Sequence, residues 1–503
     1  EKVIIFDEVP DKQENEIYLD EIIAMGDDFL AKNEDLFVQR YKSIGPDDYA
    51  NISYTSGTTA DPKGILLTHR NYTANVEQAH SVIGVEPEDK MLIILPLDHC
   101  FAHVAGFYTM MSYGASFGTV PSGKSGKEAL RNISPSIQEF KPSVMLSVPT
   151  LAKNFKKSIE TTIAKKGKTV EKLYNFALKN AIAYNKEGYN KGTQFVDIFR
   201  KPLMLLFDKL IFKAVRQGLG GNMKFFVGGG ALLDIDLQRY YYAIGIPMYQ
   251  GYGLSEATPI ISANSPARHI FGSSGKIVSP MEIKILDADG VEQPFGVKGE
   301  ICIKGENVMA GYWKNPKSTA DTIVDGWLHT GDMGYMRDEE MLYVVGRFKS
   351  LLIAADGEKY SPEGIEENLV ESSKYIDGAL LHNSQDPYTI ALITPNKEAL
   401  KAYAKELGLD PSTKEAKVKM LELLQDEVNM YRKGGRMSGA FPERWLPAAV
   451  CVLPEPWTEQ NHFLNSSMKV VRGRVEEAYK ANMEFAYTPE GKNIVNDMNL
   501  ASL

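Results

Sequence analysis

The chain has 503 residues, of which 44% are hydrophobic and 24% charged, and its formal net charge is −9 at pH 7. The length predicts more than one globular domain, and the negative charge argues against a protein whose whole surface coats nucleic acid. The three cysteines, Cys100, Cys302 and Cys451, are scattered and odd in number, which argues against a disulfide framework or a zinc site and favours a reducing compartment such as the cytoplasm.

The first residues, Glu1 to Val3, do not begin the apolar run of a secretory signal peptide. The first sequence motif starts at Tyr54, which leaves too little chain ahead of it for the parallel-sheet layers that should precede such a motif. We therefore expect the full protein to contain further residues before Glu1.

A loop rich in hydroxyl groups and glycines runs from Tyr54 to Gly64, with the sequence YTSGTTADPKG. Small residues let backbone N–H groups approach a phosphate, the hydroxyls can donate to its oxygens, and Lys63 supplies a positive charge. The Walker A pattern is absent from this loop. The loop therefore predicts a phosphate-binding site of another type, with a flexible surface turn as the alternative.

Short apolar runs then alternate with amphipathic stretches, which predicts an α/β architecture with parallel sheets. The expected buried strands are Met91–Leu97, Ser143–Val148, Lys224–Val227 and Ile246–Tyr249, and the expected helices include Asn71–Ile83 and Leu233–Ala243. The stretch from Phe101 to Ser122 lacks Asp, Glu, Lys and Arg but holds three glycines, a histidine and a proline. A membrane-spanning helix needs ~20 predominantly apolar residues, so we predict buried helix and strand there instead.

Residues 151–220 have a helical pattern and a distinct charge. Between Leu151 and Arg216 there are fifteen Lys and Arg residues against five Asp and Glu, a local net charge of +10 within a chain of −9. This composition predicts a solvated helical insertion. The alternative is attraction to an anionic membrane surface, because each basic residue near such a surface contributes on the order of 1 kcal/mol.

Two glycine-containing clusters follow the insertion. The first, Gly228–Ala231, comes directly after a predicted strand, where glycines allow a flat ligand to approach the backbone; a tight strand-to-helix turn is the alternative. The second has the sequence QGYGLSE and ends at Glu256. Within it Tyr252 can stack on a purine, Ser255 can bond a phosphate, and the Glu256 carboxylate can bind Mg²⁺ as a hard oxygen ligand.

The pattern changes after Gly272. Met281–Leu286 and Gly299–Lys304, with an Asp-Gly turn between them, predict a β-hairpin in a small antiparallel subdomain that spans 272–346. The same region ends on the sequence GWLHTGD, in which Asp332 can accept both hydroxyls of a ribose, and Arg347 then offers a rigid donor fork.

The remaining residues, 347–503, predict a separate α+β domain. Short apolar strands are expected there, each close to a helical pattern: Leu351–Ala354, Ala379–His382 and Ile390–Thr394.

These motifs, in this order, resemble those of the adenylate-forming superfamily, which includes acyl-CoA synthetases, peptide-synthetase adenylation domains and luciferases. The long helical insertion before Gly228 most resembles the long-chain fatty acyl-CoA synthetases. The resemblance implies an α/β fold with a large N-terminal domain of layered sheets over 1–346, which includes the small β subdomain, and a mobile α+β C-terminal lid over 347–503.

The resemblance also assigns roles to matching residues. The ATP phosphates would be held by Thr55, Ser56, Gly57, Thr58, Thr59 and Lys63, and adenine would be bordered by Gly229, Gly230, Gln250, Gly251 and Tyr252. The remaining matches are Ser255 (usually threonine) and the magnesium ligand Glu256, the ribose contacts Asp332 and Arg347, the acyl-site histidine His99, the hinge residue Lys349 and the adenylation lysine Lys469. Met468 and Ser350 stand where the superfamily usually has glycine and an acidic residue.

The implied activity is the ATP-dependent ligation of a long-chain fatty acid to coenzyme A through an acyl-AMP intermediate, with Mg²⁺ as cofactor and CoA as co-substrate. Two alternatives share these motifs: an acyl-AMP ligase that loads a carrier protein, and a non-catalytic protein that senses ATP or an acyl-adenylate. The absence of a GxSxG pattern disfavours a serine hydrolase. No nucleic-acid partner is expected.

Overall fold

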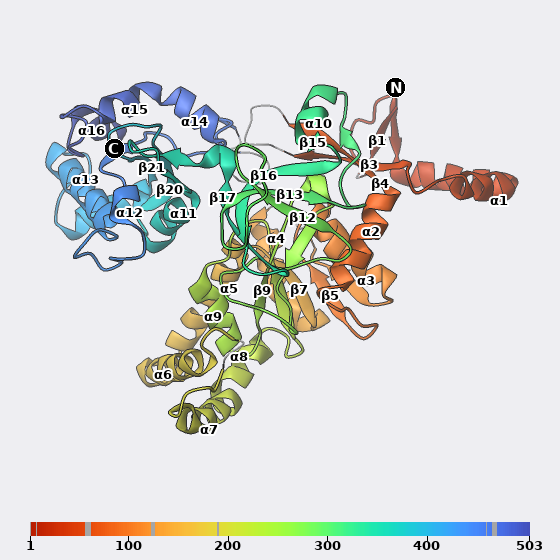
Figure 1. The fold of residues 1–503 in the computed structure, drawn as a ribbon, viewed down its shortest axis with the longest axis horizontal. Helices are drawn as coiled ribbons and strands as arrows, with labels where there is room; N and C mark the ends of the chain where they lie inside the picture. Colours follow the sequence, from red (N-terminus) through yellow and green to blue (C-terminus); the bar gives the residue numbers. More distant parts are fainter. Residues whose placement is uncertain are drawn as a thin grey trace.

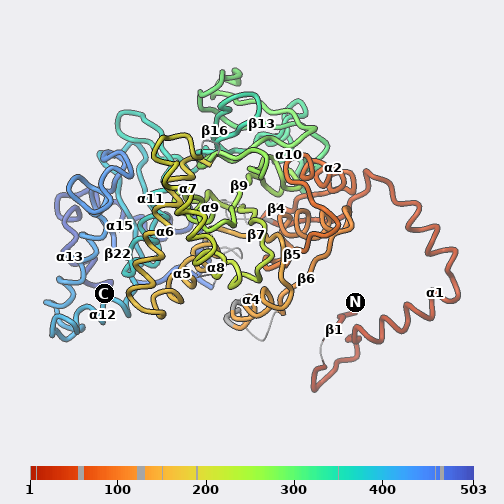
Figure 2. Tube along the Cα trace, turned by 90° about the horizontal axis from the view of Figure 1, so that it is seen from below, coloured from red at the N-terminus to blue at the C-terminus, as the bar shows by residue number. Residues whose placement is uncertain are grey.

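The computed structural model describes residues 2–6, 8–55, 62–121, 126–188, 191–458, 460–464 and 470–503. Figure 1 shows a body built on one large sheet, with the C-terminal segment on one side of it and helices α6 to α8 at the lower end. Near the N-terminus, helix α1 (Leu19–Lys42) projects away from this body in both views and has no buried residue (Figures 1 and 2). Ahead of it, β1 (Val3–Ile5) pairs with β2 (Glu16–Tyr18).

The central sheet has the strand order β12-β13-β16-β17-β11-β10-β9-β8-β7-β5-β6, with β15 beside β16. Its parallel part consists of β5 (Lys90–Ile93), β6 (Ser116–Thr119), β7 (Val144–Ser147), β8 (Phe225–Gly228) and β9 (Met248–Gly253). Its antiparallel part consists of β10 (Ile260–Ala263), β11 (Gly275–Ile277), β12 (Glu282–Leu286), β13 (Gly299–Lys304), β15 (Ile323–Val324), β16 (Trp327–Met336) and β17 (Met341–Arg347). The predicted α/β class is confirmed.

The largest differences between predicted and observed strand limits occur at the ends of β5 and β9. β5 ends at Ile93 rather than Leu97, because its ladder with β6 stops at Ile93 and the following apolar residues pack outside the ladder. β9 was expected to end at Tyr249 but continues to Gly253, because its glycine-rich end pairs with β10. The pattern of side chains did not indicate a strand there, since glycine contributes no apolar alternation.

Helices cover the parallel strands and bury their side chains. Tyr240 and Tyr241 of α9 (Ile235–Ala243) pack with Phe226 of the sheet in one apolar cluster. The chain between Phe101 and Ser116 forms a π-helix over Ala102–Tyr108 and α3 (Thr109–Ser112) before β6, so the expected helix and strand are present. Among the described helices, none is long and apolar enough to cross a membrane.

The basic region is helical, as predicted. It consists of α5 (Pro149–Ala164), α6 (Lys168–Asn185), α7 (Asp197–Phe207), a π-helical turn over Asp208–Phe212 and α8 (Lys213–Gly218). Two further helices lie before it, α2 (His69–His80) and α4 (Gly126–Phe140). A separate three-stranded sheet has the order β14-β4-β3 and is formed by β3 (Tyr49–Thr55), β4 (Lys63–Thr68) and β14 (Gly311–Tyr312), with α10 (Pro316–Thr322) following.

The C-terminal segment has its own apolar cores, formed by buried side chains that all come from residues 352–494. Its strands are β18 (Leu352–Ile353), β19 (Lys359–Tyr360), β20 (Ile376–His382), β21 (Ile390–Pro395) and β22 (Ala449–Val452). Its helices are α11 (Glu363–Ser372), α12 (Lys397–Glu406), α13 (Lys414–Asn429), α14 (Arg472–Ala478), α15 (Lys480–Ala486) and α16 (Asp497–Ser502). In Figure 1 this segment lies beside β16 and β17.

Candidate active site

Several of the predicted site residues that the structure describes lie at or near the end of β9. This strand pairs in parallel with β8 and antiparallel with β10, so it marks the change from parallel to antiparallel pairing in the central sheet. The carboxyl ends of parallel strands are the edge at which α/β sheets bind ligands. Gly229 and Gly230 follow β8 at this edge, and Ser255 and Glu256 follow β9 in a short 3₁₀ turn.

The side chain of Gln250 is buried and holds the glycine turn after β8. Its Oε1 accepts a hydrogen bond from the Leu233 N–H at 2.8 Å, and its Nε2 donates to the Ala231 carbonyl at 3.2 Å. Gly230 has φ of +83°, a conformation that favours glycine. Gln250 therefore positions the turn through its amide rather than presenting that amide to a ligand.

Phe101 lies against the same turn. A Cβ on Gly229 would come within 3.1 Å of the Phe101 ring, so the glycine allows the ring to pack on the backbone. His99, two residues earlier, is exposed, and its Nδ1 accepts a hydrogen bond from the Phe101 N–H at 3.2 Å. The structure therefore brings the segment of the predicted acyl-site histidine beside the predicted adenine turn, and the aromatic residue that joins them was not predicted.

Tyr252, Asp332 and Arg347 form one contact group. The Tyr252 hydroxyl donates to Asp332 Oδ2 at 2.7 Å, and Arg347 Nε lies 3.3 Å from Asp332 Oδ1. Asp332 and Arg347 are directly opposite partners on β16 and β17. Burial and the neighbouring carboxylate raise the pKa of Tyr252 well above its usual value, so the hydroxyl stays protonated and keeps donating.

The backbone beside Asp332 is supported by a second polar group. Glu300 on β13 accepts from the Gly331 N–H at 3.0 Å, and its other oxygen lies 2.9 Å from His329 Nδ1. Cys302 Sγ lies 3.4 Å from the same imidazole nitrogen, and burial raises the pKa of this thiol to about 12. Sequence spacing gave no sign of this group, because β-sheet pairing brings its members together.

Lys63 and Glu256 meet at Tyr312, which the sequence motifs did not single out. Lys63 Nζ lies 4.7 Å from the centre of the Tyr312 ring, and the Tyr312 hydroxyl donates to Glu256 Oε1 at 2.9 Å. Burial and the adjacent carboxylate raise the pKa of Tyr312, which keeps this donor protonated. One phenol therefore contacts a cation at its ring and a carboxylate at its hydroxyl, and the cation belongs to the segment predicted to bind phosphates.

The chain was compared with known proteins by sequence and by structure. The sequence profile of the AMP-binding enzyme family matches residues 2–313, which is more than half of the chain. The chain belongs to the AMP-binding enzyme family. Its sequence is 27% identical over 461 residues to the long-chain-fatty-acid–CoA ligase FadD15 of Mycobacterium bovis, covering 90% of this chain and 71% of that protein.

Other relatives of this AMP-binding enzyme carry different names. Long-chain-fatty-acid–CoA ligase 1 of Homo sapiens is 28% identical over 89% of this chain and 62% of its own length. A chloroplastic long-chain-fatty-acid–[acyl-carrier-protein] ligase of Arabidopsis thaliana is 26% identical over 93% of this chain and 66% of its own length. The chain thus spans about two thirds of the length of the curated relatives it matches.

Solved structures share the fold of this AMP-binding enzyme. The o-succinylbenzoate coenzyme A synthetase MenE of Bacillus subtilis, in complex with ATP and magnesium ion, matches with a TM-score of 0.58 at 22% identity, over 86% of this chain and 71% of that chain. MatB of Rhodopseudomonas palustris, bound to ATP, matches with a TM-score of 0.56 at 20% identity, over 87% of this chain and 69% of that chain.

Several predicted site residues of this AMP-binding enzyme lie outside the described residues or have side chains that are not described. Ser56, Gly57, Thr58, Thr59 and Lys469 belong to the first group, and the side chains of Thr55 and Lys349 to the second. The structure nevertheless describes the residues that flank both stretches. Thr55 and Lys63 face each other across β3 and β4, and Leu464 and Val470 form an antiparallel bridge.

The C-terminal segment reaches this site through α11. Burial raises the pKa of Glu363, and the nearby Arg347 guanidinium partly offsets that rise. A Cβ on Gly346 would lie 2.6 Å from the Ser361 hydroxyl, so the two segments touch at the end of β17. An ion pair between Lys153 of α5 and Glu371 of α11 is a second contact between them.

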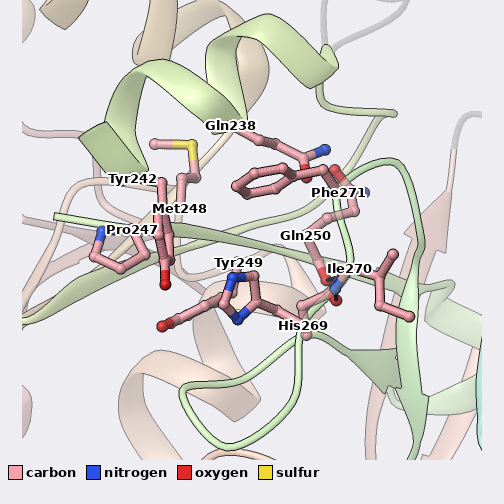
Figure 3. Close-up of a pocket in the computed structure, with 10 residues that line it drawn as sticks. Gln238, Tyr242, Pro247, Met248, Tyr249, Gln250, His269, Ile270 and Phe271 are labelled. Carbon is pink, nitrogen blue, oxygen red and sulfur yellow. Dashed lines mark hydrogen bonds between the residues drawn. The ribbon is translucent and has the colours of Figure 1, made fainter. Parts of the chain in front are cut away.

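Figure 3 shows a small pocket that is lined in part by Gln250, the residue that holds the glycine turn. It is bounded by Gln238 and Tyr242 of α9, by β9 residues up to Gln250, and by the loop that carries His269. The Gln238 amide donates to the Leu233 carbonyl at 2.8 Å, and its oxygen accepts from the Gly272 N–H at 3.3 Å. Gln238 and Gln250, which both line this pocket, therefore bond the carbonyl and the N–H of Leu233 at the end of the turn.

Tyr252→Phe is expected to raise the KM for ATP about 5- to 10-fold with little change in kcat, because it removes one hydrogen bond to Asp332 worth about 1 kcal/mol and keeps the ring. Steady-state kinetics at varied ATP measure this. Tyr335→Phe is the matched control, since that tyrosine stacks on Tyr343 further along the same sheet. Equal KM values for the two variants and the wild type would contradict a nucleotide-binding role for the Tyr252 hydroxyl.

Proposed function

We propose that this chain is an ATP-dependent ligase that joins a long-chain fatty acid to coenzyme A through an acyl-adenylate. The observation that carries the proposal is that one short segment, 250–256, contacts both polar groups: Tyr252 bonds Asp332, and Glu256 bonds Tyr312 beneath Lys63. A nucleotide bound at this segment would have a carboxylate for its ribose at one end and a cation for its phosphates at the other. The relatives named long-chain-fatty-acid–CoA ligases support the substrate class.

The first half-reaction forms the adenylate. A carboxylate oxygen of the fatty acid attacks the α-phosphorus of ATP, the bond to pyrophosphate breaks, and acyl-AMP and pyrophosphate result. Negative charge builds on phosphate oxygens, so the protein contributes positioning and electrostatic stabilisation rather than a nucleophile. Lys63 would hold the phosphates from β4, Lys469 would add a second cation, and the Asp332 carboxylate would fix the ribose.

Glu256 fits the requirements of a magnesium ligand. Its Oε1 accepts the Tyr312 hydrogen bond, and the described part of the chain forms no hydrogen bond to Oε2, which leaves a hard oxygen donor beside the predicted phosphate site. Bound there with the ATP phosphates, Mg²⁺ would neutralise charge on their oxygens. The Tyr312 hydroxyl holds the carboxylate in place for this role.

The second half-reaction forms the thioester. The sulfur of coenzyme A attacks the acyl carbonyl carbon, the bond from that carbon to the AMP oxygen breaks, AMP leaves, and the thiol proton passes to solvent. We propose that residues 347–503 act as a lid that turns about Lys349 between the two steps, relative to residues 1–346. The separate apolar cores of the C-terminal segment support such a division, and the small contacts at Ser361 and Glu371 would have to change during the motion.

The rival acceptor is a carrier protein, favoured by the relative that is named as an acyl-carrier-protein ligase. The deciding experiment supplies ATP and a chain-length series of fatty acids and measures AMP release with coenzyme A, with acyl carrier protein, or with neither. Coenzyme A alone should accelerate AMP release and yield a thioester. Acceleration by the carrier protein alone would overturn the acceptor, and the absence of pyrophosphate release with every acid would favour a non-catalytic sensor.

The three cysteines of the chain are free and buried, which supports a reducing compartment such as the cytoplasm.

A further inference from the structure

Helix α7 and its flanks expose a ridge of large apolar side chains. We call the α7 ridge the six residues whose side chains are at least half exposed, between 50% and 78%: Phe195, Ile198, Phe199, Leu205, Leu206 and Leu210. Ile198 and Leu205 are seven residues apart, as are Phe199 and Leu206, so each pair lies on the same side of the helix. The side chain of Phe207 instead points into the protein core.

The ridge is not a dispersed set of surface residues. Monomeric proteins seldom expose contiguous apolar surface of this kind unless it contacts another molecule or a membrane. The helix lies at the far lower end of the molecule, beyond the central sheet, in Figure 1. That position would let the ridge meet an extended surface without obstruction from the rest of the body.

The charges around the ridge indicate what kind of surface it meets. Lys191, Lys201, Lys209 and Lys213 are exposed beside it. The two acidic side chains of α7 and the turn that follows it are already paired with basic residues. Asp197 is held by Lys186 and Arg200, each at 3.1 Å, and Asp208 is held by Arg216 at 2.6 Å. The segment that carries the ridge therefore combines exposed apolar side chains with exposed, positively charged lysines.

We propose that the α7 ridge inserts into the headgroup region of an anionic lipid bilayer, with its lysines on the lipid phosphates. Apolar side chains flanked by lysines are the composition of helices that lie in a membrane interface. A second copy of this chain is a poorer occupant, because pairing two ridges would bring the exposed lysines of both copies together. The inference concerns this surface alone and does not depend on the reaction at the active site.

Vesicle co-sedimentation at 0.1 M salt tests the inference, using vesicles of phosphatidylcholine alone or with about a third phosphatidylserine. The full chain should bind the anionic vesicles at least about 10-fold more tightly than the neutral ones. Phe199→Ser, Leu206→Ser and Leu210→Ser combined should lose at least about 10-fold of that binding at any salt concentration. Lys201→Gln, Lys209→Gln and Lys213→Gln combined should lose the preference for anionic lipid and most of the salt dependence.

Matched controls separate insertion from loss of folding. Val291→Ser with Phe295→Ser changes apolar residues of similar exposure, 58% and 59%, between β12 and β13 and outside the α7 ridge, and should bind vesicles like the wild type. Leu206→Trp should show a blue-shifted emission on adding anionic vesicles, whereas Phe295→Trp should not. All variants should keep the far-ultraviolet circular dichroism and thermal midpoint of the wild type.

Two results would overturn the proposal. One is vesicle binding by the folded ridge variant that equals that of the wild type. The other is a dimer in analytical ultracentrifugation that the ridge variant disperses while neither protein binds vesicles, because the ridge would then be a protein interface.

Discussion

Glu256→Gln is expected to lower the rate of acyl-adenylate formation about 100-fold or more at limiting Mg²⁺ while leaving the fold intact. Glutamine has the size of glutamate but no charge, so the ligand for the metal is weakened without a cavity. The Tyr312 hydroxyl, now 2.9 Å from Oε1, can still donate to the glutamine oxygen. Pyrophosphate release from ATP and a fatty acid, measured over a series of Mg²⁺ concentrations, gives the rate.

Two controls isolate the charge at this position. Tyr312→Phe removes the hydrogen bond to Glu256 but keeps the ring beneath Lys63, so a smaller loss of about 5- to 10-fold is expected. Glu306→Gln removes a carboxylate whose side chain is 64% exposed and pairs with Arg70, and it should leave the rate unchanged. A near-normal rate for Glu256→Gln at limiting Mg²⁺ would refute the magnesium role.

The motifs single out Lys63 and Glu256 as candidate site residues, but they do not predict that Tyr312 lies between them. Tyr312 belongs to β14, a strand of two residues whose short pairing with β4 brings its ring beneath Lys63. Two residues carry no alternation of apolar and polar side chains, so no local pattern marks such a strand. The contact depends on which strand edges meet, and that information is not local in the sequence.

The antiparallel region also shows that local sequence patterns do not predict which strands pair. The hairpin of β12 and β13 was predicted from its turn, and the structure confirms it. The sequence predicted a small β subdomain. It did not predict that the strands of this region continue the parallel sheet through β9, β10 and β11. That continuity is what places Asp332 and Arg347, on β16 and β17, within reach of Tyr252. Strand patterns identify the elements, whereas their order in the sheet depends on long-range packing.

Lys469→Ala is expected to separate the two half-reactions. Acyl-AMP formation should fall about 100- to 1,000-fold, while thioester formation from supplied acyl-AMP and coenzyme A should stay within about threefold of the wild type. A lysine cation helps where negative charge develops on the α-phosphate, and that charge is absent when the thiol attacks the carbonyl carbon. The two reactions are followed as pyrophosphate release and as thioester formation.

Contacts of the residues near Lys469 should keep this segment folded in Lys469→Ala, so that the effect of the substitution on each half-reaction can be interpreted. Val471 N–H donates to the Phe463 carbonyl at 2.9 Å next to the Leu464–Val470 bridge, and Arg472 pairs with Glu366 at 2.6 Å. These contacts hold the described residues on either side of 465–469, so removing one side chain at 469 should not unfold the segment.

The control for Lys469→Ala is Lys480→Ala, which removes an equal charge from α15, where the lysine side chain is 74% exposed. Both half-reactions should be unchanged in it. Lys349→Pro should give a third pattern, because proline fixes φ near −65° at the proposed hinge and should slow the complete cycle more than either half-reaction alone. If Lys469→Ala loses both half-reactions equally in a folded protein, then either this lysine is not the adenylation lysine or the lid does not turn between the steps.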